Sequence, residues 1–314
     1  MRIIEVESPG LYTTVQDLGR YGYGPLGVSA SGAADPVALR IGNLLAGNPE
    51  NAPALEMTLA GGVFGFPEGA IVALAGSDFG AELDGAPVPP WTAYPVRPGA
   101  TLKTGMSRTG ARCYLCVNGG IDVKPFLGSA STHVLSGLGG LDGGPLRKGD
   151  RLALGAPTAD PLRARRISKT RLELLQPRKL LRTTAAPQTT LFSENSRRAF
   201  YGSPYIVSEE SNRMGVRLTG SALDTPHSGH MLSEGVSLGA IQVPAGGQPI
   251  ILFVEQQTTG GYPKVANVIS ADLASVGQLR PRDEIRFELV TPSYARDLIR
   301  QQEHLLRSEE LFRR

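Results

Sequence analysis

Short apolar runs separated by glycine- and proline-rich turns make up most of the chain. In the first half they lie at 54–59, 70–75, 100–103, 113–117 and 151–154, and in the second half they include 250–254 and 284–290. Each run is too short for a stable helix, and turns at hairpin spacing separate the runs. The pattern predicts a mainly β protein built from barrels or sandwiches.

Two segments have a helical pattern instead. Asp35 is a good N-cap, Pro36 fits the first helical position, and 47–49 should end the helix. Its apolar face is expected to consist of Val37, Ile41, Leu44 and Leu45. The second helix is expected to begin at Thr291 and Pro292 and to close the chain. Its apolar side is predicted from Tyr294, Leu298, Leu305 and Phe312.

The stretch 250–264 combines an apolar strand with an abrupt polar segment. After Val254 come a carboxylate, two amides, two hydroxyls, a glycine pair and a lysine, namely Glu255, Gln256, Gln257, Thr258, Thr259, Gly260, Gly261 and Lys264. Adjacent glycines permit positive φ, and successive N–H groups in such a turn can form an anion-binding nest. The alternative is a hairpin turn whose polar side chains face solvent.

Other polar groups follow the same logic. The glycine-rich loop 8–32 contains Gln16, Asp17, Arg20 and Ser31, although Asp17 and Arg20 could simply pair and pin the loop. The turn at 117–122 places Asn118 after a strand. Two further dense groups contain Glu209 with Arg213 and Glu234 with Gln242. Amide, carboxylate and cationic side chains of these kinds suit a polar small molecule.

The two halves of the chain echo each other. The segments 146–150 and 279–283 both read Leu-Arg-x-x-Asp and both precede an alternating strand. Between the halves, 161–183 has eight basic residues against one acid and no aromatic residue, which favours a solvated linker over a nucleic-acid surface. We predict an N-terminal domain 1–160, a basic linker 161–183 and a C-terminal domain 184–314.

Composition excludes some classes of protein. The chain has 314 residues and a formal net charge of +3, which is too mild to imply nucleic acid. The N-terminus has no signal-like core and no apolar run could cross a membrane, so a cytoplasmic location is expected. Cys113 and Cys116 lie three apart on a predicted strand and should be buried thiols on opposite faces. We expect no metal site, including at His227 and His230.

Several motifs are missing from the sequence. There is no Gly-x4-Gly-Lys-Ser/Thr loop, so any nucleotide would be held in another way. There is no Gly-x-Ser-x-Gly elbow. No Ala-Met-Lys-Met-type segment is present, so covalent biotin on this chain is not expected.

Seven motifs occurring in order carry a resemblance to a known family. They lie at 14–20, 31–35, 118–121, 211–218, 233–235, 239–244 and 257–263. Together they resemble the C subunit of the bacterial ATP-dependent 5-oxoprolinases, a family similar to the carboxyltransferase domain of urea carboxylase and to a partner of a sporulation-kinase inhibitor. The chain departs from the family pattern at Asn118, usually Ala, and at Glu255, usually Asp.

The resemblance implies a fold, a reaction and partners. The fold would be two cyclophilin-like β-barrel domains with a few short helices and a C-terminal helix. The reaction would be the ATP-dependent opening of 5-oxoproline to L-glutamate, with ATP, with or without Mg²⁺, as co-substrate and with the B and A subunits of the 5-oxoprolinase as partners. The alternatives are biotin-dependent carboxyl transfer to a urea-like amide and a non-catalytic role as the regulatory partner of a kinase-inhibitor protein.

The polar residues can be given roles in this chemistry. Charge on a lactam oxygen requires cations and N–H donors, and a carboxylate could take the lactam proton or act through water. The catalytic candidates are Glu209, Arg213, Glu234, Glu255 and Lys264. The substrate-binding candidates are Gln16, Asp17, Arg20, Ser31, Asn118, Gln242, Gln257, Thr258, Thr259, Gly260 and Gly261.

Overall fold

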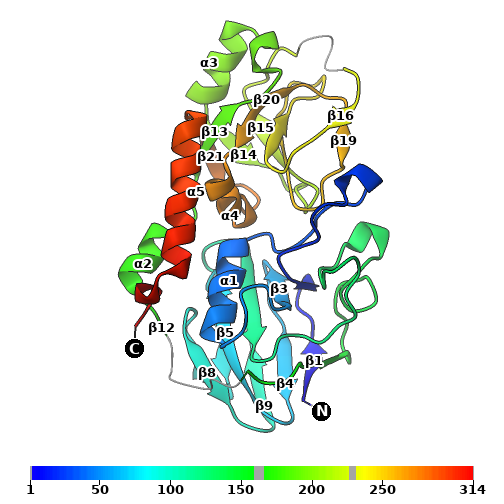
Figure 1. Cartoon of the computed structure of the whole chain (residues 1–314), viewed down its shortest axis with the longest axis vertical. Coiled ribbons are helices and arrows are strands. Elements are labelled where there is room, and N and C mark those ends of the chain that lie inside the picture. The colour runs from blue at the N-terminus through cyan, green and yellow to red at the C-terminus, as the bar shows by residue number, and fades with distance from the viewer. Residues whose placement is uncertain (1, 159–165, 226–230, 314) are drawn as a thin grey trace. The chain divides into compact units, whose positions relative to one another are not determined.

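The computed structural model describes residues 2–158, 166–225 and 231–313, so the predicted loop histidines His227 and His230 lie outside the described residues. The chain divides into two compact units (Figure 1). Unit 1 comprises Met1–Arg20, Ser31–Leu175 and Leu305–Arg314, and unit 2 comprises Tyr21–Ala30 and Gln176–His304. This division differs from the predicted boundaries because 21–30 and 305–314 pack within the unit that is distant in sequence.

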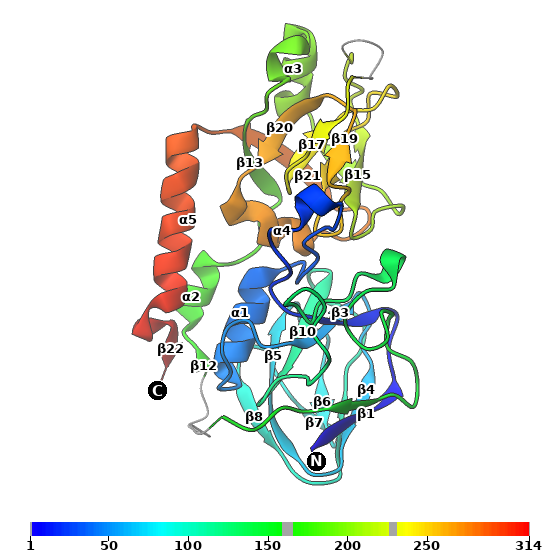
Figure 2. The same ribbon diagram turned by 45° about the vertical axis from the view of Figure 1, so that its right-hand side comes forward.

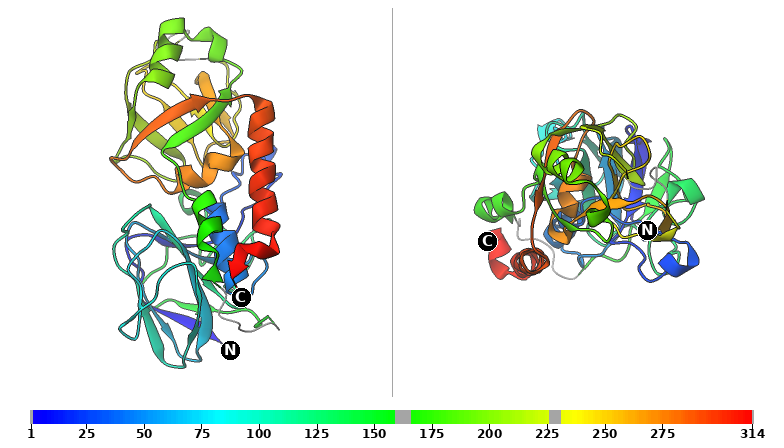
Figure 3. Two further views of the ribbon diagram at one scale, coloured as in Figure 1. Left: turned by 90° about the vertical axis from the view of Figure 1, so that its left-hand side faces the viewer. Right: turned by 90° about the horizontal axis from the view of Figure 1, so that it is seen from above.

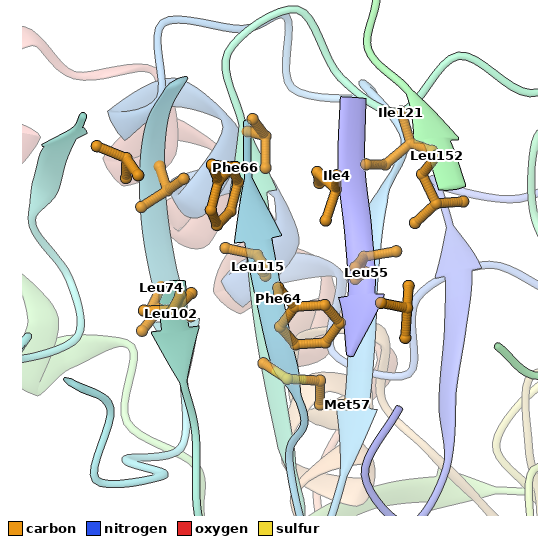
Figure 4. Close-up of a cluster of buried hydrophobic side chains, with 14 of the residues drawn as sticks. Ile4, Leu55, Met57, Phe64, Phe66, Leu74, Leu102, Leu115, Ile121 and Leu152 are labelled. Atoms are coloured by element: carbon orange, nitrogen blue, oxygen red, sulfur yellow. The ribbon is translucent and has the colours of Figure 1, made fainter. Parts of the chain in front are cut away.

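Unit 1 contains two antiparallel sheets. The six-stranded sheet has the order β11 (Arg151–Ala153), β1 (Ile3–Ser8), β4 (Val63–Phe66), β9 (Ala100–Lys103), β6 (Glu82–Leu83) and β7 (Ala86–Pro87). The five-stranded sheet has the order β2 (Thr13–Gln16), β3 (Ala54–Thr58), β10 (Arg112–Val117), β5 (Ala70–Gly76) and β8 (Ala93–Val96). Alternate residues of both sheets form one core, with Leu55, Met57, Phe64, Phe66 and Leu115 among its members (Figure 4).

The first predicted helix is confirmed as α1 (Pro36–Leu45). The Asp35 carboxylate accepts a hydrogen bond from the Ala38 amide at 2.9 Å, as an N-cap should. Three of its four predicted apolar residues are buried, and Leu44 is half-buried. A β-carbon at Gly42 would lie 2.7 Å from Cys116 Sγ, so glycine permits the close approach of α1 to β10.

Both cysteines are buried and free, as predicted. Cys113 belongs to the apolar core, whereas Cys116 faces α1 on the other side of the sheet. Burial raises the pKa of both thiols, so neither is a ready nucleophile or metal ligand.

Unit 2 is a closed seven-stranded barrel (Figure 2). Its order is β13 (Leu180–Ala185), β20 (Lys264–Val268), β17 (Ala240–Gln242), β18 (Ile250–Leu252), β15 (Gly215–Gly220), β14 (Tyr205–Val207) and β21 (Glu284–Leu289), with β13 and β21 parallel. A short ribbon of β16 (Glu234–Gly235) and β19 (Thr259–Gly260) is added to it. The mainly β fold and a barrel in the second half are therefore confirmed.

Short helices complete the fold. They are α2 (Lys169–Leu174), α3 (Glu194–Gly202), α4 (Leu273–Gly277), η1 (Gly24–Leu26), η2 (Val134–Ser136), η3 (Thr189–Leu191), η5 (Ser270–Asp272) and η6 (Glu309–Leu311). Phe200 of α3 stacks on Phe287 of β21 at 4.4 Å between ring centroids, which anchors α3 on the barrel. The described part of the predicted linker is structured: it holds β12 (Arg166–Ile167), α2 and the start of β13.

The two similar segments, 146–150 and 279–283, form the same turn. In unit 1 the Arg147 amide donates to Asp150 Oδ2 at 2.7 Å, and in unit 2 the Arg280 amide donates to Asp283 Oδ2 at 2.9 Å. In both turns the amide of the aspartate donates back to the carbonyl of the arginine. The repeat seen in the sequence is therefore a repeat of structure.

The residue before each of these aspartates has positive φ. Gly149 adopts it at 91° without strain, whereas Arg282 adopts it at 71° against the steric preference of a side-chain-bearing residue. Each turn also exchanges a pair of backbone hydrogen bonds with a valine of a neighbouring strand, Val6 of β1 or Val207 of β14. Equivalent turns thus join equivalent strands in the two units.

The C-terminal helix begins where predicted, but its apolar side differs. It is α5 (Pro292–Arg307), an uninterrupted helix (Figure 3). The predicted Tyr294 is 49% exposed, whereas Leu306, absent from the prediction, is buried. Phe312 lies beyond the helix in β22 (Phe312–Arg313), where it pairs with Ile167 of β12. The apolar period in the sequence continues past Arg307, where the helix ends. None of the helices in the described ranges has the length and apolar character needed to span a bilayer.

Candidate functional site

Two strands of unit 2 place an amide and an ammonium next to each other. Gln242 at the end of β17 lies directly opposite Lys264 at the start of β20. Both side chains are buried. The β16–β19 ribbon brings Glu234 opposite Gly260 in the same way. Pairing between strands, which determines side-chain neighbours, therefore assembles residues from three separate segments.

Lys264 and Glu234 form an ion pair that Gln188 holds in place. Lys264 Nζ donates to Glu234 Oε1, and Gln188 Nε2 donates to the same oxygen at 2.9 Å. The Lys264 amide in turn donates to Gln188 Oε1 at 3.4 Å. The Lys264 ammonium holds the pKa of the Glu234 carboxyl below its ordinary value, with burial opposing and Gln188 assisting. Glu234 is thus a charged acceptor whose side chain is 41% exposed, whereas that of Lys264 is 5% exposed.

The side-chain amides of two glutamines lie beside this ion pair. Gln257 Nε2 donates to Gln242 Oε1 at 3.2 Å. A β-carbon at Gly260 would lie 2.6 Å from Gln242 Nε2, so only glycine leaves room for that amide. We call the group the Lys264 cluster: it consists of Gln188, Glu234, Gln242, Gln257, Gly260 and Lys264.

Arg213 and Glu255 form a buried ion pair in the same unit. Arg213 Nε donates to Glu255 Oε1 at 2.5 Å, and both side chains are nearly inaccessible to solvent. The Glu255 amide also donates to the Arg213 carbonyl at 2.9 Å. A buried ion pair with added backbone bonds fixes the start of the polar segment that follows β18.

The other predicted residues of unit 2 do not join the cluster. Glu209 pairs with Arg282 at 2.8 Å on the surface, where its side chain is 64% exposed. The Thr258 carbonyl accepts from the Val236 amide, and Thr259 is exposed on β19. Gly261 lies next to the ribbon, with its carbonyl accepting from Met231.

The glycine nest that the sequence permitted at 260–261 does not form. Neither Gly260 nor Gly261 has a φ in the left-handed region, and Gly260 is part of an extended strand. A nest needs successive residues in right-handed and left-handed helical conformations, which an extended strand lacks. The glycines instead allow neighbouring groups to approach the backbone closely. A β-carbon at Gly261 would lie 2.9 Å from the Met231 carbonyl oxygen.

In unit 1, Asp17 is the centre of a saturated network, which we call the Asp17 cluster. Its carboxylate accepts from the Gly19 amide at 2.8 Å, the Ala130 amide at 2.7 Å, and the hydroxyls of Ser129 at 2.6 Å and Ser131 at 2.5 Å. The network ties the loop after β2 to 129–131. The carboxylate thus has a structural role here.

The remaining predicted residues of unit 1 are also buried. Arg20 donates to the Phe126 and Ser131 carbonyls and lies over the Phe126 ring at 5.7 Å. Gln16 donates to Thr14 and Thr132, while its Oε1 and the Ser31 hydroxyl have no hydrogen-bond partner among the described residues. Ser31 has φ 52°, a strained value for serine.

Asn118 has a set of hydrogen bonds of its own. Its Nδ2 donates to the Ala46 carbonyl at 2.8 Å and to Thr158 Oγ1 at 2.7 Å, and its carbonyl accepts from Arg2 at 3.0 Å. These bonds tie the end of β10 to the end of α1. Asn118 is engaged as a structural residue.

The comparisons with known proteins agree on the family. Residues 26–289 match the family described as carboxyltransferase domain, subdomain A and B. The chain belongs to this family. It is 42% identical to the C subunit of the 5-oxoprolinase of Escherichia coli K12 over 91% of this chain and 90% of that protein. It is 38% identical to the C subunit of the Haemophilus influenzae 5-oxoprolinase over 96% and 94%.

A solved structure confirms the fold at full length. The crystal structure of the K. lactis urea amidolyase superposes with a TM-score of 0.90 at 30% identity, covering 99% of this chain and 21% of that one. The chain thus corresponds to about a fifth of that larger protein. Carboxyltransferase-family membership and the mainly β fold were both predicted from the sequence.

Sequence reasoning missed two groups of residues. Gln188 lies 46 residues before Glu234 and 76 before Lys264, in no motif, so nothing local marked it. Ser129 and Ser131 were missed for the same reason. Within the described ranges there is no group of three or more His, Cys, Asp or Glu side chains that could hold a metal ion.

Proposed function

We propose that this chain is the C subunit of an ATP-dependent 5-oxoprolinase that opens 5-oxoproline to L-glutamate together with the A and B subunits. The observation that carries the proposal is the likeness to two proteins named as C subunits of 5-oxoprolinase over nearly the whole of both chains. The Lys264 cluster supports it, because its donors and acceptor are complementary to those of a lactam.

The cluster suggests how this chain would treat the lactam. Opening the ring adds water to the carbonyl carbon, breaks the C–N bond and leaves a proton on the nitrogen. The Lys264 ammonium would oppose negative charge developing on the oxygen. Because its pKa is lowered, Glu234 is a weak base at neutral pH and would hold the lactam N–H as an acceptor.

The Lys264 cluster does not fit a nucleoside triphosphate. A triphosphate needs several uncommitted cations or N–H donors. Here Lys264 is committed to Glu234, and Arg213 is committed to Glu255. We therefore propose that ATP, and any Mg²⁺ with it, binds elsewhere in the assembled enzyme, and we derive no step through it.

The test is ATP hydrolysis by this chain mixed with the A and B subunits, with and without 5-oxoproline. We expect lactam-dependent hydrolysis that is lost when this chain is omitted. Glu234→Gln should reduce it by about 100-fold, since one charged group of the site is lost. Glu209→Gln is the matched control, because it removes a carboxylate from a surface ion pair, and it should leave turnover unchanged.

Complex formation without lactam-dependent turnover would overturn the proposal. The second candidate is carboxyl transfer from a partner's biotin to a urea-like nitrogen. It is favoured by the structural likeness of nearly the whole of this chain to about a fifth of a urea amidolyase. It predicts exchange of a carboxyl group with free biotin that depends on urea and not on 5-oxoproline. No turnover in either assay, with a stable complex, would favour a regulatory role.

A further inference from the structure

One buried donor in unit 2 has no acceptor. Gln242 is 2% exposed, and its Nε2 has no hydrogen-bond partner among the residues that the structure describes. Buried amide groups are seldom left in this state, because they lose their hydrogen bonds to water without replacement. The donor is therefore a candidate contact for a ligand atom.

The orientation of this amide is set by its neighbour. Gln257 Nε2 donates to Gln242 Oε1 at 3.2 Å, so the oxygen faces Gln257 and the nitrogen faces away from it. The nitrogen lies over Gly260, where a β-carbon would come within 2.6 Å. Gln257 thus acts as a positioning residue for Gln242.

The unpaired donor and the ion pair belong to one site. Gly260, which Gln242 Nε2 approaches, lies directly opposite Glu234 in the β16–β19 ribbon. Lys264, which binds Glu234, lies directly opposite Gln242 between β17 and β20. Each of these four residues thus neighbours two of the others. Among them, the Gln242 Nε2 donor is unused and the Glu234 carboxylate is partly exposed.

We propose that Gln242 Nε2 donates a hydrogen bond to the carbonyl oxygen of the amide group of a small ligand and so determines the specificity of the site. An amide also offers an N–H group, for which the Glu234 carboxylate is the acceptor. A ligand with an N–H group where the amide has oxygen would place two donors face to face and be rejected. The lactam identity of the ligand rests on the proposed function, but the ligand class does not.

The test compares two probes of nearly equal shape on the full-length chain. 2-Pyrrolidinone has the carbonyl oxygen, and protonated 2-iminopyrrolidine has N–H donors in its place. Binding is followed by ligand-observed NMR, and a Kd on the order of 1 mM is expected for pyrrolidinone with the wild type. The amidine should bind at least about 10-fold more weakly.

Gln242→Glu keeps the size and the acceptor for Gln257 but replaces the donor by an acceptor. It should weaken pyrrolidinone binding by about 10- to 100-fold and reverse the preference in favour of the amidine. Gln301→Glu, an exposed position on α5, makes the same change of charge and should alter neither. Unchanged pyrrolidinone binding by Gln242→Glu would overturn the proposal, as would failure of the wild type to bind it at millimolar concentrations.

A second pair of variants avoids a buried carboxylate. Gly260→Ala puts a β-carbon against Gln242 Nε2, whereas Gly235→Ala, on the paired strand, meets nothing within 4 Å. Only the first should weaken pyrrolidinone binding, by about 10-fold; equal binding by both would overturn the proposal. Gln242-dependent binding without 5-oxoproline-dependent ATP hydrolysis would retain the ligand class and reject the proposed function alone.

Discussion

Two carboxylates, one in each unit, were site candidates, Asp17 for substrate binding and Glu234 for catalysis, and their environments differ. Asp17 in unit 1 accepts four hydrogen bonds from amides and hydroxyls and is almost fully buried. Glu234 in unit 2 accepts from Lys264 and Gln188 on one oxygen, and its side chain remains partly exposed. A carboxylate has about four lone-pair positions. Asp17 accepts four bonds, three on Oδ1 and one on Oδ2, whereas Glu234 accepts its two bonds on Oε1 and has capacity left for a ligand.

The comparison separates carboxylates that are committed to the fold from carboxylates that are able to bind a ligand, although both have the same chemistry. A saturated carboxylate stabilises the fold, and its loss leaves several buried donors unsatisfied. A carboxylate with capacity left contributes less to folding and can bind a substrate. Removing the saturated group should thus affect stability first, and disturbing the other should affect turnover first.

The largest expected effect is on the stability of the Asp17→Ala variant. The substitution leaves two amides and two hydroxyls without their acceptor, so we expect a loss of about 3–5 kcal/mol in the free energy of unfolding. Urea unfolding at pH 7 measures it. Asp122→Ala is the control, since Asp122 is exposed, and it should change stability by less than about 0.5 kcal/mol. Equal stability of the two variants would show that Asp17 is not the structural group described here.

The next effect is on turnover by the Lys264→Met variant. Methionine retains most of the buried apolar stem but removes the ammonium, so kcat of the assembled enzyme should fall by about 100-fold or more. The thermal midpoint should change much less than in Asp17→Ala. Lys179→Met is the matched control, because Lys179 pairs with Asp283 through an exposed side chain. If both lysine variants retain full turnover, the Lys264 cluster is not the active site.

Local patterns predicted what local forces determine. The Asp35 cap and Pro36 define α1, and the apolar run at 250 defines β18, because each signal lies within a few residues of its effect. The turn repeat at 146–150 and 279–283 was visible for the same reason.

Non-local pairing determined the rest. The bond between Gln188 and Glu234, and the register that sets Gln242 opposite Lys264, depend on how the barrel closes. From the sequence, Glu209 and Glu234 were both catalytic candidates. Strand pairing, however, brings Glu234 to Lys264 and leaves Glu209 on the surface. Residue type indicated which groups could act, and only the topology decided which of them meet.

The smallest effect concerns the pH dependence of stability in unit 2. Because Lys264 lowers the pKa of Glu234 below its ordinary value of 4.5, the folded chain holds that proton less tightly than the unfolded chain. The stabilisation is therefore fully present above the unfolded pKa and is lost as the pH falls through the lowered folded value. Urea unfolding of the wild type and of Glu234→Gln should differ in free energy most at neutral pH, by less than about 1 kcal/mol because the carboxylate is partly exposed. The difference should shrink as the pH falls below the unfolded value of 4.5 and disappear below the lowered folded pKa. Lys264→Met should remove the same pH-dependent part, and a difference that grows toward low pH would contradict the pairing of these two residues.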